Sequence, residues 1–502
     1  MCGIAAIWGK TDPDAVRSIL DRLPHRGPDG RGTHVVQPLG DTGATLGHAR
    51  LSIIDPAGGQ QPLVADEGTA LVCNGMIYND ARLREALERR AFASGSDSES
   101  ILQGFIEQGP EIVGRLDGMF AFVLAGADGS AFAARDPLGI KPLYTGRIGG
   151  ALAFASEIKA LADVAEDIRE FPPGHTWDSH HGFRRYYEVP RPDPVNWSEE
   201  QAAVAVRRHL CEAVRKRLRS DVPLGAFLSG GLDSSIIAAI ARQHVHELHT
   251  FAVGLEGSSD LAAARRVASH LDTVHHEYVI GSDEVGDALS GVLHHLESYD
   301  RDLVRSAVPT WFVARLAAQR VKVVLTGEGA DELFAGYGYY GAYAGDGAAL
   351  QAETRRCLAT MHNVNLQRVD RMTMAHGLEA RVPFLDTAMV DLAMRLPAAF
   401  KQRPGAPDGA KWILRKAFED WLPEEIVWRR KLQFDEGSGF SDHLAAHARR
   451  EVAAARVGRP DGCAEECLYH DLLAGTFGDP EQVLGLTAHW SANRVASPSR
   501  AA

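Results

Sequence analysis

The spacing of hydrophobic and polar positions divides the chain into two parts, which differ in the order of their expected strands and helices. In the first part, short β-like runs lie at 4–8, 70–73, 119–124, 130–134 and 151–155, and helical patterns lie at 14–23, 80–89 and 98–108. The segment Ala-Asp-Gly-Ser at 127–130 has the composition of a hairpin turn between two of these runs. Hairpin strands mixed with helices predict an α+β arrangement.

The rhythm changes after a proline-bearing stretch at 188–195, which has the composition of an extended linker. Strands are expected at 222–228, 249–255, 275–280 and 321–325, and helices at 198–219, 236–245, 260–270 and 308–319. Strands that alternate with helices predict a parallel, doubly wound sheet. Beyond residue 351 the pattern is mainly helical. We therefore expect domains at 1–187 and 198–502, joined by a linker at 188–197.

Length, composition and charge exclude several classes of protein. The 502 residues are too many for one ordinary core, and 45% hydrophobic with 24% charged residues is a globular balance. No apolar run reaches the ~18–20 residues that span a bilayer, so we expect a cytoplasmic protein without a membrane partner. A net charge of −13 argues against a nucleic-acid partner. Cys463, Cys467 and His470 would share a helix face, but three ligands without a fourth make a metal site a weak hypothesis, which we reject.

Cys2 directly follows the initiator methionine, so removal of Met1 would place a thiol and a free α-amine on one residue. Their unperturbed pKa values, about 8.5 and about 7.7–8.0, allow the amine to accept the proton of the thiol near neutrality. Such a nucleophile needs no distant histidine. Taken alone the feature is weak, because any residue can follow an initiator methionine.

Two loops at the ends of expected strands carry groups suited to phosphate chemistry. Ser-Gly-Gly-Leu-Asp-Ser-Ser at 229–235 combines small residues and a helix N-terminus, which favour an anion. It lacks the Gly-Lys-Ser/Thr ending of a Walker loop. It resembles the signature of pyrophosphate-loop ATPases. Three carboxylates, Glu328, Asp331 and Glu332, follow a later strand and could be magnesium ligands or a general base. The alternatives are a capped helix for the first loop and a solvated acidic loop for the second.

Ordered motifs along nearly the whole chain resemble those of the glutamine-hydrolysing asparagine synthetase family. The motifs at 1–4, 25–30, 50–55, 74–79, 96–99 and 134–144 resemble a class II glutamine amidotransferase domain, and those at 229–235, 251–254, 327–332, 379–386 and 431–434 resemble the synthetase domain. The resemblance implies an α+β N-terminal nucleophile hydrolase sandwich with αββα layers. An α/β parallel-sheet pyrophosphate-loop ATPase domain with a mainly helical C-terminal part would follow. It also implies glutamine, ATP and aspartate as substrates, with Mg2+ as cofactor, and leaves a homodimer open.

The resemblance further implies roles for residues of the glutaminase part. Cys2 would attack the carboxamide of glutamine, with Asn74 and Gly75 forming the oxyanion hole. Arg50 would bind the α-carboxylate of glutamine and Asp97 its ammonium group. The alternatives are a surface ion pair for Arg50 and a helix cap for Asp97.

In the synthetase part, the residues implied for binding the ATP pyrophosphate are Ser229, Gly230, Gly231, Asp233, Ser234, Ser235 and Gly327. Asp233 and Asp331 would hold Mg2+. Glu328 would act as a base when ammonia attacks the acyl-adenylate, and Lys431 would stabilise the oxyanion. The alternative for Lys431 is a solvated basic run. The family carries ammonia between its two sites through an internal passage.

The chain departs from the family pattern at two places. Met76 stands where the family has a glutamate that helps to bind the glutamine ammonium, so we expect a weaker but real glutaminase. In the acceptor segment, Arg305 is kept, whereas two threonines are replaced by Asp302 and Leu303. Asp302 would repel a dicarboxylic acceptor unless Arg301 neutralises it. We favour aspartate as acceptor, with a specialised carboxylic acid of secondary metabolism as the alternative.

Two further hypotheses compete with an amide synthetase. A ring-closing relative of the β-lactam synthetase type would activate a carboxylate for an internal amine, but such relatives typically have no working N-terminal cysteine. A non-catalytic homologue would bind nucleotide without releasing pyrophosphate. The presence of Cys2, Arg50, Asn74 and Asp97 argues against the first hypothesis, and the intact loop at 229–235 argues against the second.

Overall fold

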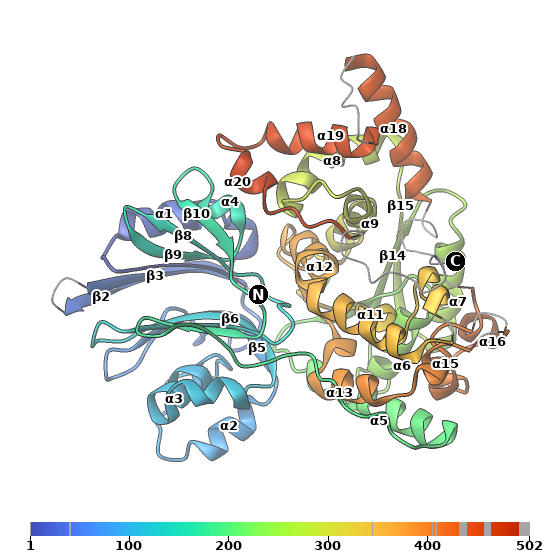
Figure 1. Ribbon diagram of the computed structural model, residues 1–502, viewed down its shortest axis with the longest axis horizontal. Coiled ribbons are helices and arrows are strands. Elements are labelled where there is room, and N and C mark those ends of the chain that lie inside the picture. The colour runs from blue at the N-terminus through green and yellow to red at the C-terminus, as the bar shows by residue number, and fades with distance from the viewer. Residues whose placement is uncertain are drawn as a thin grey trace.

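The computed structural model describes residues 2–39, 42–343, 345–403, 405–406, 409–430, 439–455 and 463–490. A part rich in strands lies beside a part in which helices surround a parallel sheet (Figure 1). Between Arg185 and Glu199 the chain forms neither helix nor strand. None of the helices in the described ranges is both long and apolar enough to cross a membrane.

The first part contains two six-stranded antiparallel sheets, ordered β10-β8-β9-β1-β3-β2 and β12-β11-β7-β6-β5-β4. The strands of the first sheet are β1 (Gly3–Trp8), β2 (Gly30–Leu39), β3 (Thr42–Arg50), β8 (Tyr144–Ile148), β9 (Ala151–Ala155) and β10 (Glu166–Glu170). Those of the second are β4 (Leu63–Val64), β5 (Ala70–Ile77), β6 (Gly118–Ala125), β7 (Ala131–Arg135), β11 (His175–Asp178) and β12 (Gly182–Arg185). The helices are α1 (Pro13–Asp21), α2 (Asp80–Ala86), α3 (Glu99–Gln108) and α4 (Ile158–Leu161), with 3-10 turns at Pro24–Arg26 and Gly109–Arg115.

Strand β1 shows why the sheets stack. Successive side chains point to opposite faces of a strand, and both faces of β1 are apolar. Ile4 and Ala6 pack between the two sheets, whereas Ala5 and Ile7 pack against α1. Helices α1 and α4 lie outside one sheet and α2 and α3 outside the other (Figure 1). The expected αββα sandwich is confirmed.

The second part is built on a five-stranded parallel sheet, ordered β15-β14-β13-β16-β17. Its strands are β13 (Leu224–Phe227), β14 (His249–Gly254), β15 (Val274–Val279), β16 (Val323–Leu325) and β17 (Glu379–Arg381). Its longer helices are α5 (Glu199–Arg217), α6 (Leu232–Arg242), α7 (Ser259–Leu271), α8 (Ser282–Leu296), α9 (Arg301–Ala317), α11 (Gly347–Thr360), α12 (Asn365–Met374), α13 (Thr387–Arg395), α18 (Phe440–Ala455) and α19 (Ala464–Ala474). The shorter ones are α10 (Ala330–Leu333), α14 (Ala398–Lys401), α15 (Trp412–Phe418), α16 (Glu424–Val427) and α20 (Glu481–Leu484), with 3-10 turns at Gly338–Tyr343, Met361–Asn363 and Pro383–Leu385.

Two helices begin earlier than the hydrophobic pattern predicts. Helix α6 begins at Leu232 rather than 236, so most of the phosphate-loop motif forms its first turn. Helix α9 begins at Arg301 rather than 308, because the Asp300 carboxylate accepts a hydrogen bond from the backbone nitrogen of Leu303 and caps the helix. Strand β17 lies in the region expected to be mainly helical.

The two parts meet at a buried network of ion pairs. Arg26 is fully buried and contacts Glu157 Oε1 at 2.6 Å and Asp370 Oδ2 at 2.7 Å. Arg371 lies 3.2 Å from Glu157 and 2.9 Å from Glu297. Arg26 and Glu157 belong to the sandwich, whereas Asp370, Arg371 and Glu297 belong to α12 and the C-terminal end of α8. Charges from both parts therefore neutralise one another inside the interface.

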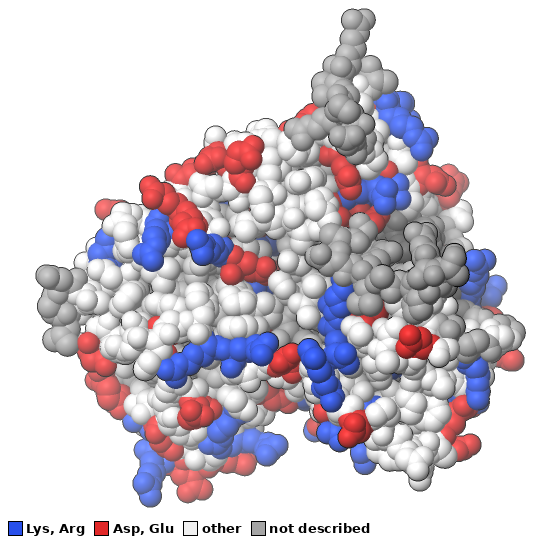
Figure 2. Space-filling model, in the orientation of Figure 1, with Lys and Arg blue, Asp and Glu red and all other residues white. Residues whose placement is uncertain are grey.

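Acidic and basic side chains are interspersed on the face of the molecule drawn in Figure 2. Basic side chains form a row across the middle of that face, with acidic side chains beside it. The arrangement agrees with the net charge of −13.

Candidate active sites

Cys2 lies immediately before β1, beside the side chain of Asn74 on β5. The backbone nitrogen of Cys2 donates a hydrogen bond to Asn74 Oδ1 at 3.0 Å. The other amide atom, Asn74 Nδ2, is buried and has no hydrogen-bond partner among the described residues. A buried donor without a partner is costly unless a ligand uses it. A free donor on a side chain that contacts Cys2 suits an oxyanion.

Gly75 follows on the same strand, where β5 pairs closely with β6. A Cβ atom at this position would come within 2.5 Å of the carbonyl oxygen of Met119 and 2.9 Å of Phe120 Cα. Any other residue would push the strands apart. Glycine therefore keeps the backbone of the Asn74–Gly75 pair beside Cys2.

Arg50 and Asp97, the two residues expected to hold glutamine, are both buried. Arg50 donates to the carbonyl oxygens of Pro56 at 2.9 Å and Asp55 at 2.7 Å, and is not part of a surface ion pair. Asp97 Oδ2 accepts a hydrogen bond from the backbone nitrogen of Ile77 at 2.6 Å. The structure therefore does not place Asp97 as the cap of α3.

The Asp97 carboxylate lacks a cationic neighbour in ion-pair contact among the described residues, and burial raises its pKa to about 6. A buried carboxylate is stabilised by a cation close to it. The ammonium group of an amino acid would supply that cation. Burial and chemistry thus agree with the role that the family resemblance implies.

His48 is a site residue that the sequence motifs did not reveal. It lies on β3 opposite Ile4, its Nε2 contacts the carbonyl oxygen of Cys73 at 3.2 Å, and its Nδ1 is buried without a partner among the described residues. Burial by itself raises the pKa of the Cys2 thiol, but His48 and other nearby groups outweigh it and lower the pKa to about 7. The one signal was its place two residues before Arg50, on the same face of a strand.

Met76 is buried on β5, opposite Met119 on β6. Both belong to an apolar cluster that also contains Leu51 from the sandwich and Leu232 from the phosphate loop. The cluster therefore runs from the neighbourhood of the cysteine into the second part.

The phosphate loop connects β13 to α6 and folds tightly against α7. Gly230 has φ +71°, and a Cβ atom there would lie within 2.5 Å of the backbone of Ala263 and Ala264. The hydroxyl groups of Ser234 and Ser235 donate to the carbonyl oxygen of Gly231 at 3.2 and 2.7 Å. Only glycine allows this turn, which directs the loop into a cavity.

That cavity, of about 750 Å3, collects most of the residues expected in the synthetase site. The expected residues that line it are Ser229, Gly231, Asp233, Ser234, Asp302, Arg305, Gly327, Glu328 and Asp331. Gly230 and Ser235 do not line it. Ser235 is fully buried, so its hydroxyl serves the helix rather than the cavity. Lys431 lies outside the described residues.

Lys411 is a second residue that the sequence motifs did not reveal. Its Nζ lies 2.6 Å from Asp233 Oδ2 and 2.6 Å from Asp331 Oδ1, and its side chain is buried. The two carboxylates expected to hold Mg2+ thus converge on one cation position, as oxygen ligands of a hard cation must. The residues fit the ion.

The carboxylates that follow β16 have different surroundings. Glu328 forms an ion pair with Arg368 of α12. Glu332 is buried and accepts hydrogen bonds from Tyr337 and Asn365 at 2.6 Å. Burial and the neighbouring charges of Glu328 and Asp331 raise the pKa of Glu332 to about 7.

The acceptor end of the cavity carries two ion pairs. Arg301 Nε lies 3.0 Å from Asp302 Oδ1, so the negative charge that would repel a dicarboxylic acceptor has a partner. Arg305 donates through Nε and Nη2 to the carboxylate of Glu465, at 2.8 and 2.5 Å. Glu465 lies on α19, and the sequence motifs did not reveal it.

Comparison with known proteins agrees with this geometry. The family described as asparagine synthase matches residues 205–349 and 344–497, and the glutamine amidotransferase domain family matches residues 1–172. The chain is 42% identical to asparagine synthetase [glutamine-hydrolyzing] 3 of Arabidopsis thaliana over 90% of this chain and 82% of that one. It is also 42% identical to asparagine synthetase [glutamine-hydrolyzing] of Triphysaria versicolor, over 90% and 81% of the two chains.

Among solved structures, the chain is similar to glutamine phosphoribosylpyrophosphate amidotransferase from B. subtilis complexed with ADP and GMP. The TM-score is 0.33 with 22% identity, and the match covers 48% of this chain and 64% of that chain. The two matching families and the curated relatives together span both parts of the molecule. The chain belongs to the glutamine-hydrolysing asparagine synthetase family.

Proposed function

We propose that this enzyme makes asparagine from aspartate, with glutamine as the nitrogen donor and ATP as the source of activation. One observation carries the proposal: the same chain holds the Cys2–Asn74 arrangement and a separate cavity lined by the phosphate loop. Each arrangement suits one half of the reaction.

In the glutaminase half, the α-amine of Cys2, free once Met1 is removed, takes the proton of the thiol. The sulfur attacks the carboxamide carbon of glutamine, and Asn74 Nδ2 with the Gly75 backbone stabilises the oxyanion. The intermediate collapses to a thioester and releases ammonia, and water then releases glutamate. Arg50 and Asp97 orient the substrate through its α-carboxylate and ammonium groups.

In the synthetase half, the loop at 229–235 and Gly327 bind the phosphates of ATP. A carboxylate oxygen of aspartate attacks the α-phosphorus, pyrophosphate leaves, and the acyl-adenylate becomes open to ammonia. Glu328 accepts a proton from the attacking ammonia, and AMP leaves. Asp233 and Asp331 would hold Mg2+, which when bound neutralises charge on the phosphates. Lys431 remains our proposed stabiliser of the second oxyanion.

Ammonia must travel between the halves in its neutral form, because ammonium is not a nucleophile. The apolar cluster that contains Leu51, Met76, Met119 and Leu232 supports a route through the interface, since apolar walls disfavour the charged form.

The test is to incubate processed enzyme with ATP, Mg2+, aspartate and glutamine, and to measure asparagine, AMP and pyrophosphate. We expect all three products in equal amounts. The Cys2→Ala variant should lose synthesis from glutamine and keep synthesis from ammonium chloride. If the wild type forms no asparagine from either nitrogen source, the proposal is wrong. Offering other carboxylic acids in the same assay identifies the true acceptor.

A further inference from the structure

Helix α19 places a buried carboxylate directly behind Arg305. The Glu465 side chain is 6% exposed, and both of its oxygens contact Arg305, Oε1 at 2.8 Å and Oε2 at 2.5 Å. The hydroxyl of Tyr469, one turn later on α19, donates to Glu465 Oε1 at 3.2 Å. Three hydrogen bonds therefore fix this carboxylate.

The pairing leaves part of the guanidinium group available. Arginine has five N–H donors in a planar fork, and Glu465 engages only the edge formed by Nε and Nη2. Arg305 lines the cavity, whereas Glu465 is not among the lining residues. The second edge, formed by Nη1 and the outer hydrogen of Nη2, can therefore donate two hydrogen bonds to a carboxylate.

Without Glu465, Arg305 would have another acidic partner nearby. Asp302 lies three residues earlier on α9, the spacing at which side chains of opposite charge pair along a helix. In the structure Asp302 is already paired with Arg301, and Arg305 is held by α19 instead. Glu465 thus holds the guanidinium group of Arg305 toward α19 instead of toward Asp302.

We propose that Glu465 is a positioning residue for acceptor binding: it holds Arg305 so that the free edge meets the carboxylate of the acceptor that is not activated. This inference rests on the proposed function, and it makes the C-terminal helix α19 part of the acceptor site. A competing role, in which Glu465 occupies the place of the acceptor, predicts the opposite sign, because its removal would then improve acceptor binding.

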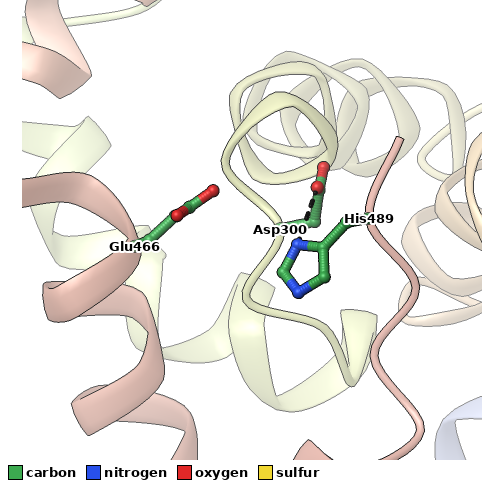
Figure 3. A group of neighbouring side chains, drawn as sticks. All are labelled: Asp300, Glu466 and His489. Atoms are coloured by element: carbon green, nitrogen blue, oxygen red, sulfur yellow. Dashed lines mark hydrogen bonds and ion pairs between the residues drawn. The ribbon is translucent and has the colours of Figure 1, made fainter. Parts of the chain in front are cut away.

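The adjacent residue on α19 provides a matched control. Glu466 carries the same charge, and its side chain points toward Asp300 and His489 (Figure 3). Both glutamates can be changed to glutamine without a change in size. E465Q weakens the contact with Arg305, whereas E466Q removes the same charge from the adjacent position of the helix.

The experiment measures KM for aspartate, KM for ATP, kcat and glutaminase rate in the wild type, E465Q, E466Q and Glu465→Asp. We expect E465Q to raise KM for aspartate about tenfold or more, by analogy with the tenfold to hundredfold losses that follow when a group that orients a metal-ligating side chain is removed. KM for ATP and the glutaminase rate should stay unchanged. Glu465→Asp should restore part of the affinity, and E466Q should match the wild type.

An unchanged or lowered KM for aspartate in E465Q overturns the inference, as does an equal rise in E466Q. If E465Q does not fold, the Tyr469→Phe variant, which removes one hydrogen bond to Glu465, should raise the same KM by a smaller factor, and no rise overturns the inference. If the wild type makes no asparagine, the proposed function fails separately. The four enzymes are then compared through KM for whichever carboxylic acid supports pyrophosphate release from ATP.

Discussion

Asn74 accepts a hydrogen bond from the backbone nitrogen of Cys2 through its side-chain oxygen at 3.0 Å, while its side-chain nitrogen is buried and without a partner in the described part of the chain. The amide of Asn74 can thus accept one hydrogen bond and donate another. An aspartate carboxylate could not do both, because it offers no donor. We expect Asn74→Asp to reduce the glutaminase rate by about 10²–10³. Synthesis from ammonium chloride should be unaffected. Glutamate release during steady turnover measures the first effect, and equal loss of both activities would contradict the assignment.

His48 should set the pH dependence of the glutaminase. The thiolate is the nucleophile, so a pKa of about 7 for Cys2 predicts that the rate rises with pH through about 7. Replacing His48 with asparagine removes an influence that lowers this pKa, so the midpoint should move toward higher pH. The pH profile of kcat/KM for glutamine provides the measurement. An identical midpoint in both enzymes would show that His48 does not act on the thiol.

Asp97 should make glutamine binding depend on pH. Its pKa is raised to about 6, so the carboxylate becomes protonated, and loses its attraction for the ammonium group, as the pH falls through about 6. We expect KM for glutamine to rise below that pH. Asp97→Asn should raise KM for glutamine ten- to a hundredfold at pH 8, because one charged hydrogen bond contributes about 1.5–3 kcal/mol. The same variant should remove the pH dependence of this KM.

Because Met76 offers no charge to the ammonium group of glutamine, Asp97 alone should bind that group. We expect the wild type to release glutamate, with a high requirement for glutamine. Absence of glutamate release from fully processed enzyme at high glutamine would refute this. Mass spectrometry of the intact protein shows whether Met1 has been removed before that test is made.

Lys411 should stabilise the fold when Mg2+ is not bound. Changing it to methionine removes a buried ammonium group that contacts the carboxylates of Asp233 and Asp331, and loss of one partner from a buried ion pair typically costs about 3–5 kcal/mol of unfolding free energy. Millimolar Mg2+ should restore part of the melting temperature, because the ion can replace the ammonium group.

Lys416, five residues later, is the control for this prediction. Its ion pair with Glu419 is partly exposed, and such pairs contribute about 0–1 kcal/mol. Lys416→Met should therefore melt within a few degrees of the wild type and should not respond specifically to Mg2+. A similar response of both variants to Mg2+ would argue against a cation position between the two aspartates.

Local sequence motifs predicted much of the site, because loops such as 229–235 and 327–332 carry their chemistry within a few residues. The α+β and parallel-sheet classes followed from strand and helix spacing, whereas the αββα layers followed from the family resemblance. The start of α9 could not be read from hydrophobicity, because it depends on a capping bond from Asp300 to Leu303. Strand β3 was missed, and His48 with it, since the strand has small residues and no clear alternation.

The residues missed in the synthetase site were missed for a different reason. Lys411 reaches Asp233 across 178 positions of the chain, and Glu465 reaches Arg305 across 160. Neither pairing can be recognised from the residues that neighbour either partner in the sequence. The sequence could not show which of two adjacent glutamates, Glu465 or Glu466, faces α9, because the packing of α19 against α8 and α9 determines it.

The charges around Arg26 have a consequence for the exchange of parts between relatives. Arg26 joins the backbone of Cys2, through a 3.0 Å hydrogen bond to its carbonyl oxygen, to Asp370 of the other half. A chimera whose glutaminase half lacks Arg26 or Glu157 would leave Asp370 and Arg371 buried without these partners. An exchange of halves between proteins therefore requires that the charges on the two sides of this interface match.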